Sequence, residues 1–412
     1  MPSAFILIES NTSGTGPLFV AAAAALGLRP VLLAADPALY PYAERDGVET
    51  IRLDTGDREA LLAACRHLRE MAGLAGIWSS SEYFIAEAAG LARELGLPGP
   101  DPDAVAACRD KGVQRTRLSQ AGVGQPRFRI AASAAAAVTA AESLGLPVVV
   151  KPVLGTGSLG VRLCADSREV EEAAASILAR RVNERGMPLP DRLLVEEVAV
   201  GPEVSLETFG FEVVGFTRKH LGEPPFFVEV GHDFPAPLPA AEERALTAAA
   251  VRALDALGLG WGPAHLEVKR TADGPLIIEV NPRLAGGFIP ELVLLATGVE
   301  LIGETVAAAC GREVRLGSGA RQAASIRFLL APGEGRLAAV EGLDEAARSE
   351  GVTDVRLYVQ PGAAITRRGD FRDRIGHVIG RGRTPDESGR AAERARDRLR
   401  VVLAPAGDRV EA

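Results

Sequence analysis

Cysteine, excess positive charge and long apolar runs are all scarce in this sequence. Its 412 residues include four Cys without a C-x-x-C pair, which argues against a disulfide framework or a cysteine-based zinc site. No run reaches the roughly 18 apolar residues of a membrane span, and the N-terminus lacks the basic start of a signal peptide. The formal net charge of -8 argues against nucleic-acid or anionic-membrane partners. We therefore expect a cytoplasmic protein.

The chain is too long for a single ordinary core, so its length predicts two or three domains. Its N-terminal part alternates a buried strand pattern at 4–8, an Ala-rich helix pattern at 17–26 and a second strand pattern at 30–34. This order predicts an open parallel α/β domain. Another strand pattern at 76–79 leads to Glu82. Because such sheets bind ligands at the carboxyl ends of their strands, Glu82 is a candidate substrate-binding residue.

The segment at 264–287 predicts a β-hairpin. Polar and apolar residues alternate on its first arm, the tripeptide Ala-Asp-Gly is a turn signal, and an apolar strand pattern returns after it. A three-residue loop with Gly274 in the left-handed conformation would place Glu267 directly opposite Glu279.

Two carboxylates that face each other across a strand pair destabilise a sheet unless a cation neutralises them. A hard divalent cation is the simplest explanation, and Glu267, Glu279 and Asn281, which period two places on the same face, suit Mg²⁺ or Mn²⁺. Mg²⁺ usually takes one or two carboxylates together with substrate phosphates, so the pattern also predicts a bound phosphoester. Arg283 continues the same face and is placed to hold an anion beside the metal.

A second candidate site follows the apolar strand pattern at 148–150. Lys151 comes next, and the sequence GTGSLG occupies 155–160. Taken alone this is a dinucleotide fingerprint, but that fingerprint requires a helix directly after the glycines. Here residues 160–165 alternate like a strand, so the glycines predict a hairpin lid whose backbone N–H groups close over phosphates while Lys151 supplies a point charge. The residues expected to cradle the phosphates are Gly155, Thr156, Gly157 and Ser158.

Together, E-x11-E-x-N-x-R and the lysine–glycine loop resemble the ATP-grasp superfamily, and within it the carboxylate–amine ligases that include the L-amino-acid (dipeptide) ligases. The resemblance covers most of the chain. It implies an α/β and α+β fold that begins with an open parallel α/β domain at 1–105, followed by linker helices and a small lid at 106–195. A mixed-sheet core at 196–310, which contains the metal hairpin, and a C-terminal α+β subdomain at 311–412 complete the expected fold.

The resemblance also implies roles for residues whose type alone signals little. Lys111 would contact the nucleotide phosphates. Glu197 and Ala199 would read the adenine edge through their backbone groups, and Glu196 or Glu203 would be positioned for ribose or amine contacts.

Residues 224–235 are too rich in proline and aromatic residues for a regular element, so we expect a binding loop there. Within it, Glu229 and His232 match the Glu-x-x-His with which amino-acid ligases approach their amino-acid substrate, the carboxylate facing its ammonium group. Gly286 and Gly287 let the backbone approach a ligand closely, and the pocket for the amine is expected beside them.

These features predict an ATP-dependent ligase with Mg²⁺ or Mn²⁺ as cofactor. A substrate carboxylate would attack the γ-phosphate of ATP to give an acyl phosphate, an amine would displace phosphate, and Arg283 would stabilise the developing charge. The expected partners are an amino acid and an amine, and a homodimer is one possible assembly.

Three alternatives stay open: an NAD-dependent oxidoreductase that uses the glycine loop as its fingerprint, a non-catalytic nucleotide-binding regulator, and a purine-pathway or carboxylase-type ATP-grasp ligase that takes a small anion. The arginine-rich stretch at 367–400, with eleven arginines against six acidic residues, is expected to be a solvated face.

Overall fold

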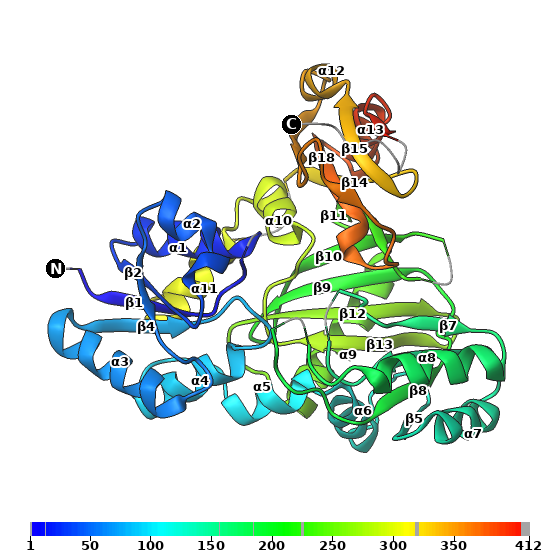
Figure 1. The fold of residues 1–412 in the computed structure, drawn as a ribbon, viewed down its shortest axis with the longest axis horizontal. Coiled ribbons are helices and arrows are strands. Elements are labelled where there is room, and N and C mark those ends of the chain that lie inside the picture. Colours follow the sequence, from blue (N-terminus) through cyan, green and yellow to red (C-terminus); the bar gives the residue numbers. More distant parts are fainter. Residues whose placement is uncertain are drawn as a thin grey trace.

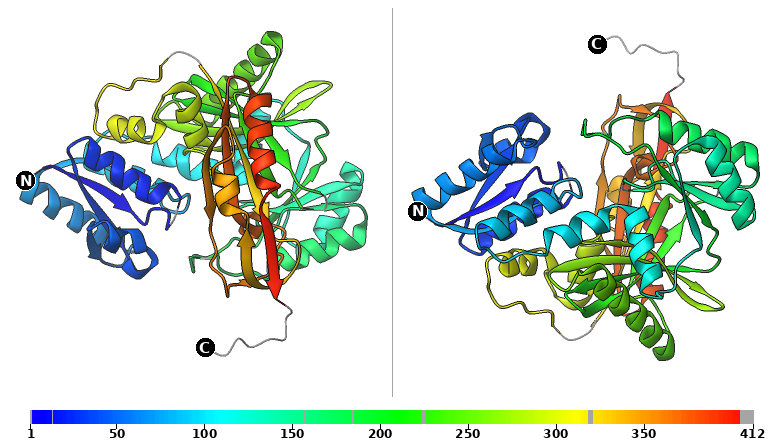
Figure 2. Two further views of the ribbon diagram at one scale, coloured as in Figure 1. Left: turned by 90° about the horizontal axis from the view of Figure 1, so that it is seen from above. Right: turned by 90° about the horizontal axis from the view of Figure 1, so that it is seen from below.

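The computed structural model describes residues 2–12, 14–155, 157–183, 185–223, 226–317 and 321–404. Within these ranges, the chain builds four sheets (Figures 1 and 2). Thr156, one of the expected phosphate-binding residues, lies outside the described residues. The α/β and α+β fold class is confirmed, because a parallel sheet forms the N-terminal part and antiparallel sheets follow it.

The N-terminal sheet is parallel and has the strand order β3-β2-β1-β4. Strand β1 (Ala4–Ile8) is wholly buried because its two faces enter different apolar clusters, with Phe5 and Leu7 in one and Ile6 and Ile8 in the other. The remaining elements of this part are β2 (Arg29–Ala34), β3 (Glu49–Arg52), β4 (Leu74–Trp78), α1 (Thr15–Ala25), η1 (Pro37–Leu39), α2 (Pro41–Arg45), α3 (Arg58–Ala72) and α4 (Ile85–Glu94).

Two short helices connect this domain to the rest, α5 (Pro102–Arg109) and α6 (Lys111–Gln120). Asp110 separates them and caps α6, because its side chain accepts hydrogen bonds from the first free N–H groups of that helix. The cap fixes Lys111 as the first residue of α6.

A four-stranded sheet with the order β5-β8-β6-β7 and two helices form the part expected to be the lid, which is called the lid below. The glycine loop leads into strand β7 and only then into helix α8, as the sequence predicts, so the helix that a dinucleotide fingerprint requires is replaced by a strand. The lid elements are β5 (Phe128–Ala131), α7 (Ala134–Leu144), β6 (Val148–Pro152), β7 (Arg162–Cys164), α8 (Ser167–Ala179) and β8 (Leu193–Glu197).

The central sheet has eight strands in the order β13-β12-β9-β10-β11-β14-β18-β16. Helix α9 packs on its β13 end, and the lid lies beside the same end in Figure 1. Its elements are β9 (Glu203–Phe209), β10 (Glu212–Leu221), β11 (Glu229–Phe234), α9 (Ala240–Leu257), β12 (Pro263–Thr271), β13 (Gly274–Asn281), β14 (Ala323–Leu330), β16 (Val352–Leu357) and β18 (Arg374–Gly382).

The β12–β13 hairpin has the predicted register, reached in an unpredicted way. Glu267 pairs with Glu279, but the loop contains two residues, because Thr271 already pairs with Gly274. A β-bulge at Ile278 adds the missing residue and restores the register beyond it.

The expected loop at 224–235 is wrong for its second half. Residues 229–234 form strand β11, which is hydrogen-bonded to β10 on one side and β14 on the other. Burial in the middle of the sheet outweighs the local composition, and His232 is completely buried. Pro224 and Pro225 lie outside the described residues.

Two helices return the chain to the N-terminal domain after the hairpin, α10 (Ile289–Thr297) and α11 (Leu301–Ala309), and α11 packs against α1 and β4. Among the described helices none is singly long and apolar enough to cross a membrane, although α10 and α11 together pass that test as a pair bent by 102°. The remaining elements are β15 (Gly335–Glu341), α12 (Leu343–Ala347), β17 (Ala364–Ile365), η2 (Phe371–Asp373), α13 (Pro385–Arg396) and β19 (Arg400–Ala404).

Candidate active site

The facing carboxylates of the hairpin are each bound to a lysine from another element. Lys219 of β10 lies 2.6 Å from Glu267, and Lys111 of α6 lies 2.8 Å from Glu279. These contacts use Oε1 of each carboxylate. The like charges that the sequence places opposite each other are therefore neutralised by ammonium groups within the protein itself.

Lys111 also connects the hairpin to the glycine loop. Its Nζ donates to the Gly155 carbonyl at 2.7 Å, while its backbone N–H donates to Val153. Burial would lower the pKa of Lys111, but Glu279 and Glu82 raise it above its ordinary value, so the side chain stays charged. A buried cation between the lid and a carboxylate is suited to an anionic ligand.

Lys151 ends in a second buried ion-pair cluster. Its Nζ lies 2.7 Å from Glu196, whose other oxygen accepts from Arg115 at 2.6 Å. Burial would raise the pKa of Glu196, but Arg115 and Lys151 together lower it to about 2. Glu196 therefore positions Lys151 at the root of the glycine loop.

Arg115 is a site residue that the sequence does not reveal. It is 1% exposed, and besides Glu196 it binds the carbonyls of Ile277 and Ile278 at 2.8 and 2.6 Å. The guanidinium thus satisfies the backbone of the β-bulge that sets the hairpin register. The neighbouring Gln114 pairs with both backbone groups of Val280. Nothing in the local sequence distinguishes these two side chains from solvated helix residues.

Four acidic side chains converge around Lys219 and its neighbours. Lys219 lies within 2.8 Å of Glu203, Glu229 and Glu267, and Glu203 also binds Lys269 at 3.2 Å. Behind them, His265 is held 3.0 Å from Glu207, and its pKa is raised to about 9, since Glu207 and Glu267 outweigh the effect of burial. Glu203 is therefore a partner of lysines in this sheet.

Glu229 and His232 lie close together, for a reason that the sequence does not show. Residues three apart on a regular strand point to opposite faces, but a register shift at Val230 brings the carboxylate within 3.6 Å of His232 Nε2. Neither ring nitrogen of this buried histidine has a hydrogen-bond partner among the described residues. Burial lowers the pKa of His232 to about 3, so the imidazole is neutral.

Arg374, from the start of β18, also binds Glu229. Its Nη2 lies 2.6 Å from the carboxylate, and its Nε donates to the Glu229 carbonyl. Burial would raise the pKa of Glu229, but the positive charges of Lys219 and Arg374 hold it well below its ordinary value. The sequence analysis does not identify Arg374, which lies in the stretch expected to be a solvated face.

Gly287 packs directly on His232. A Cβ at this position would lie 2.6 Å from His232 Nε2, and residues other than glycine rarely adopt its backbone φ of +60°. The glycine therefore belongs to the same pocket as the histidine.

Arg283, just after β13 of the central sheet, forms an ion pair with Glu82 of the N-terminal domain. The guanidinium Nη2 lies 2.6 Å from the carboxylate, which keeps the pKa of Glu82 low against the opposing effect of burial. Glu82 therefore positions Arg283 from the carboxyl end of β4. Asn281 is buried at the end of β13 opposite His265.

The expected adenine segment lies at the end of β8. The Glu197 backbone N–H already donates to the Arg127 carbonyl, and its carboxylate binds the Arg127 side chain at 2.6 Å. Ala199 is half-buried just after the strand. In the glycine loop, Ser158 has a φ of +62° and donates to the Phe227 carbonyl at 3.2 Å.

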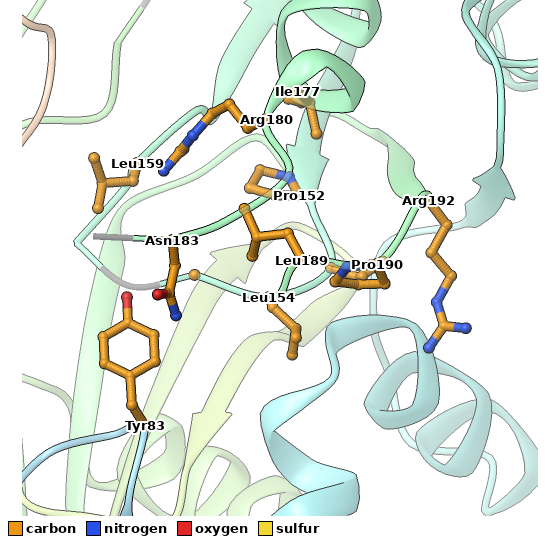
Figure 3. Close-up of a pocket in the computed structure, with 12 residues that line it drawn as sticks. Tyr83, Pro152, Leu154, Leu159, Ile177, Arg180, Asn183, Leu189, Pro190 and Arg192 are labelled. Atoms are coloured by element: carbon orange, nitrogen blue, oxygen red, sulfur yellow. The ribbon is translucent and has the colours of Figure 1, made fainter. Parts of the chain in front are cut away.

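A cavity opens between the lid and the N-terminal domain beside Gly155. In Figure 3 the Tyr83 hydroxyl points toward Asn183, and Leu154, Leu159 and Leu189 line the apolar wall.

The hairpin residues expected to bind Mg²⁺ are oxygen donors, and the structure places a lysine against each of the two carboxylates. Within the described ranges, no group of three or more His, Cys, Asp and Glu side chains is arranged to hold a metal ion. Glu267, Glu279 and Asn281 instead offer two carboxylates and an amide, the small oxygen set with which Mg²⁺ accepts phosphate and water as further ligands.

Three family models identify the class of protein to which this fold belongs. An ATP-grasp N-terminal domain model matches residues 20–99, an ATP-grasp domain model matches 144–291, and an L-amino acid ligase C-terminal domain 2 model matches 327–404. The chain belongs to the ATP-grasp superfamily of ligases. It is a carboxylate–amine ligase, an enzyme that forms C–N bonds, and it is similar to the L-amino-acid ligases.

Individual relatives support this assignment. The chain is 41% identical over 408 residues to uncharacterized protein y4rH of Sinorhizobium fredii, covering 99% of this chain and 84% of that protein. It is 30% identical over 245 residues to carnosine synthase 1 of Mus musculus, covering 55% of this chain but 29% of that protein. The crystal structure of an L-amino acid ligase from Bacillus licheniformis superposes with a TM-score of 0.82 at 23% identity, covering 98% and 99% of the two chains.

Proposed function

We propose that this protein activates the carboxylate of an amino acid as an acyl phosphate, at the expense of ATP, and couples it to an amine. The observation that carries the proposal is the meeting of Glu229, His232 and Gly287 beside the hairpin carboxylates. An ammonium group would find a charged acceptor in Glu229, close to residues suited to phosphate.

Different residues would bind the phosphates and the metal ion. Lys111, Lys151 and the backbone of the glycine loop would hold the β- and γ-phosphates, and Glu196 and Arg115 would keep Lys151 in place. Mg²⁺, held by Glu267, Glu279 and Asn281, would neutralise charge on the phosphates.

Arg283 would stabilise the negative charge that develops when the substrate carboxylate attacks and when the amine adds to the acyl phosphate. Its pKa is raised above the ordinary value because Glu82 outweighs burial, so the guanidinium is a fixed cation. The neutral imidazole of His232 can accept a hydrogen bond from the amino acid or the incoming amine.

The test is a screen for ADP release with amino acids singly and in pairs, with phosphorus NMR of the products. We expect ADP and phosphate, with an amide product, only when a suitable pair is present. AMP and pyrophosphate would show activation by adenylation instead. ADP release that depends on a small anion such as bicarbonate, and on no amino acid, would favour the carboxylase-type alternative.

A further inference from the structure

Residues 367–374, here called the strap, connect the amino-acid subsite to the phosphate lid. At one end, Arg374 binds the Glu229 carboxylate and carbonyl, and its guanidinium lies 4.0 Å from the centre of the Phe328 ring. Toward the other end, Phe371 lies against Gly157 so closely that a Cβ on this glycine would overlap the ring.

The strap is folded by its own aspartates. Asp373 accepts the backbone N–H groups of Arg368 and Gly369 at 2.8 Å each, and Asp370 accepts that of Arg372 at 2.9 Å. Asp370 is 3% exposed, although it lies in an arginine-rich surface stretch. Two side-chain caps in eight residues give a turn of defined shape, which can hold an aromatic ring in a fixed place.

Three contacts bring the strap, the glycine loop and the segment before β11 together. The Phe371 ring meets Gly157, the Phe226 ring packs on Gly369, and the hydroxyl of Ser158 donates to the Phe227 carbonyl. Gly157 and Ser158 both have a left-handed φ, near +60°. Residues 155–158 are glycines and small polar residues, so this part of the loop gains little from its own packing and an external ring can decide its position.

We propose that the strap holds the phosphate-binding loop closed, with Phe371 as the positioning residue and Arg374 as its anchor at the amino-acid subsite. Phe371 touches neither the phosphates nor the reacting atoms in this scheme. It acts through Gly157 and Ser158, whose backbone N–H groups are placed over the phosphates by the contact. That this anchor lies at an amino-acid subsite rests on the proposed function, which assigns the amino acid to the Glu229 carboxylate.

The chain offers a matched control. Phe371 is 42% exposed, and Phe211, on the turn between β9 and β10, is 46% exposed with its ring packed on Gly260 in the same way. Phe371→Ala should raise the Kd of a non-hydrolysable ATP analogue with Mg²⁺, measured by calorimetry, by about five-fold, which corresponds to the loss of a half-buried phenyl contact. Phe211→Ala should leave it within about two-fold, and Phe371→Leu should restore most of the affinity.

A second measurement reports the purpose of closure. A loop that opens more often admits water to the activated carboxylate, so Phe371→Ala should release more phosphate per amide formed, whereas Phe211→Ala should keep the wild-type ratio. Gly157→Ala tests the contact between Gly157 and the Phe371 ring. It should weaken analogue binding less in the Phe371→Ala background than in the wild type, because the ring with which the new methyl group overlaps is then absent.

If Phe371→Ala and Phe211→Ala have the same analogue affinity and the same phosphate-to-amide ratio, the proposal that the strap holds the loop closed is wrong. The proposed ligase function would be unaffected by that result. If no amino acid stimulates ADP release by the wild type, the proposed function fails instead. The analogue measurement then still decides whether Phe371 holds the loop.

Discussion

Replacing Glu196 with Gln should destabilise the protein at neutral pH by an amount set by its two buried cations. The side chain is 3% exposed between Arg115 and Lys151, and its pKa falls from 4.5 to about 2 on folding. A shift of this size corresponds to about 3 kcal/mol, because each pKa unit is about 1.4 kcal/mol. Gln leaves both cations without their counter-charge, a loss that measured buried pairs place at about 3–5 kcal/mol.

The pH dependence gives the sharper test. A carboxylate whose folded pKa is depressed contributes its stability above the unfolded value of 4.5 and loses it as the pH falls toward 2. The gap in unfolding free energy between wild type and Glu196→Gln should narrow from about 3 kcal/mol at pH 7 to about 1.5 kcal/mol at pH 3. Urea unfolding at both pH values measures the gap.

Glu197→Gln is the matched control, since it changes the next residue of β8, whose carboxylate forms a surface pair with the 65% exposed side chain of Arg127. Its cost should stay below about 1 kcal/mol. A gap for Glu196→Gln that is as small as that of the control, or that does not change with pH, would refute the assignment of Glu196 as the buried counter-ion of Lys151 and Arg115.

Three further changes address the substrate side and the sheet. Glu229→Ala should raise the KM for the activated amino acid about tenfold or more, because a charge-assisted hydrogen bond is lost. The KM for ATP should stay nearly unchanged, because Arg374 keeps its bond to the Glu229 carbonyl and its contact with the Phe328 ring. The exposed Glu223→Ala is the control, and an equal rise in both KM values would contradict an amino-acid subsite. Gly287→Ala should reduce kcat and weaken amino-acid binding, because its methyl group would lie 2.6 Å from His232 Nε2. Full activity of this variant in initial-rate assays would show that Gly287 does not line the substrate pocket. His265, whose folded pKa is raised from 6.5 to about 9, contributes stability below pH 6.5 that is lost as the pH rises toward 9, so wild type should lose about 3 kcal/mol over this window in urea unfolding and His265→Gln should not.

The hairpin shows how far sequence patterns lead. Alternation and the facing glutamates predicted the pairing of Glu267 with Glu279, which the structure confirms. The loop length behind that prediction was wrong, and the bulge that corrects it is held by Arg115, a residue more than 160 positions away whose guanidinium binds the Ile277 and Ile278 carbonyls. Contacts of this kind leave no periodic signal, because they depend on how separate elements meet.

The segment around Glu229 and His232 shows the opposite case. Their match to the Glu-x-x-His of amino-acid ligases pointed to the pair, whose role stays a prediction, but local composition predicted a loop where the sheet imposes strand β11. Strand pairing on both sides supplies backbone hydrogen bonds that outweigh the preferences of single residues. The roles given to individual site residues, including Glu197 and Ala199 at the adenine edge, stay predictions.

The central sheet also limits how this enzyme can be recombined with its relatives. A chimera joined near residue 311 would separate β11 from β14, although these strands are paired along Gly231–Phe234, and would remove Arg327 and Arg374 from Asp233 and Glu229. The relative's own strand would then have to pair with β11, and any mismatch would leave β11 as an unpaired edge, the kind of surface through which β proteins associate. Exchange of substrate preference between such ligases should therefore transfer the sheet as one piece, with the last hundred or so residues included.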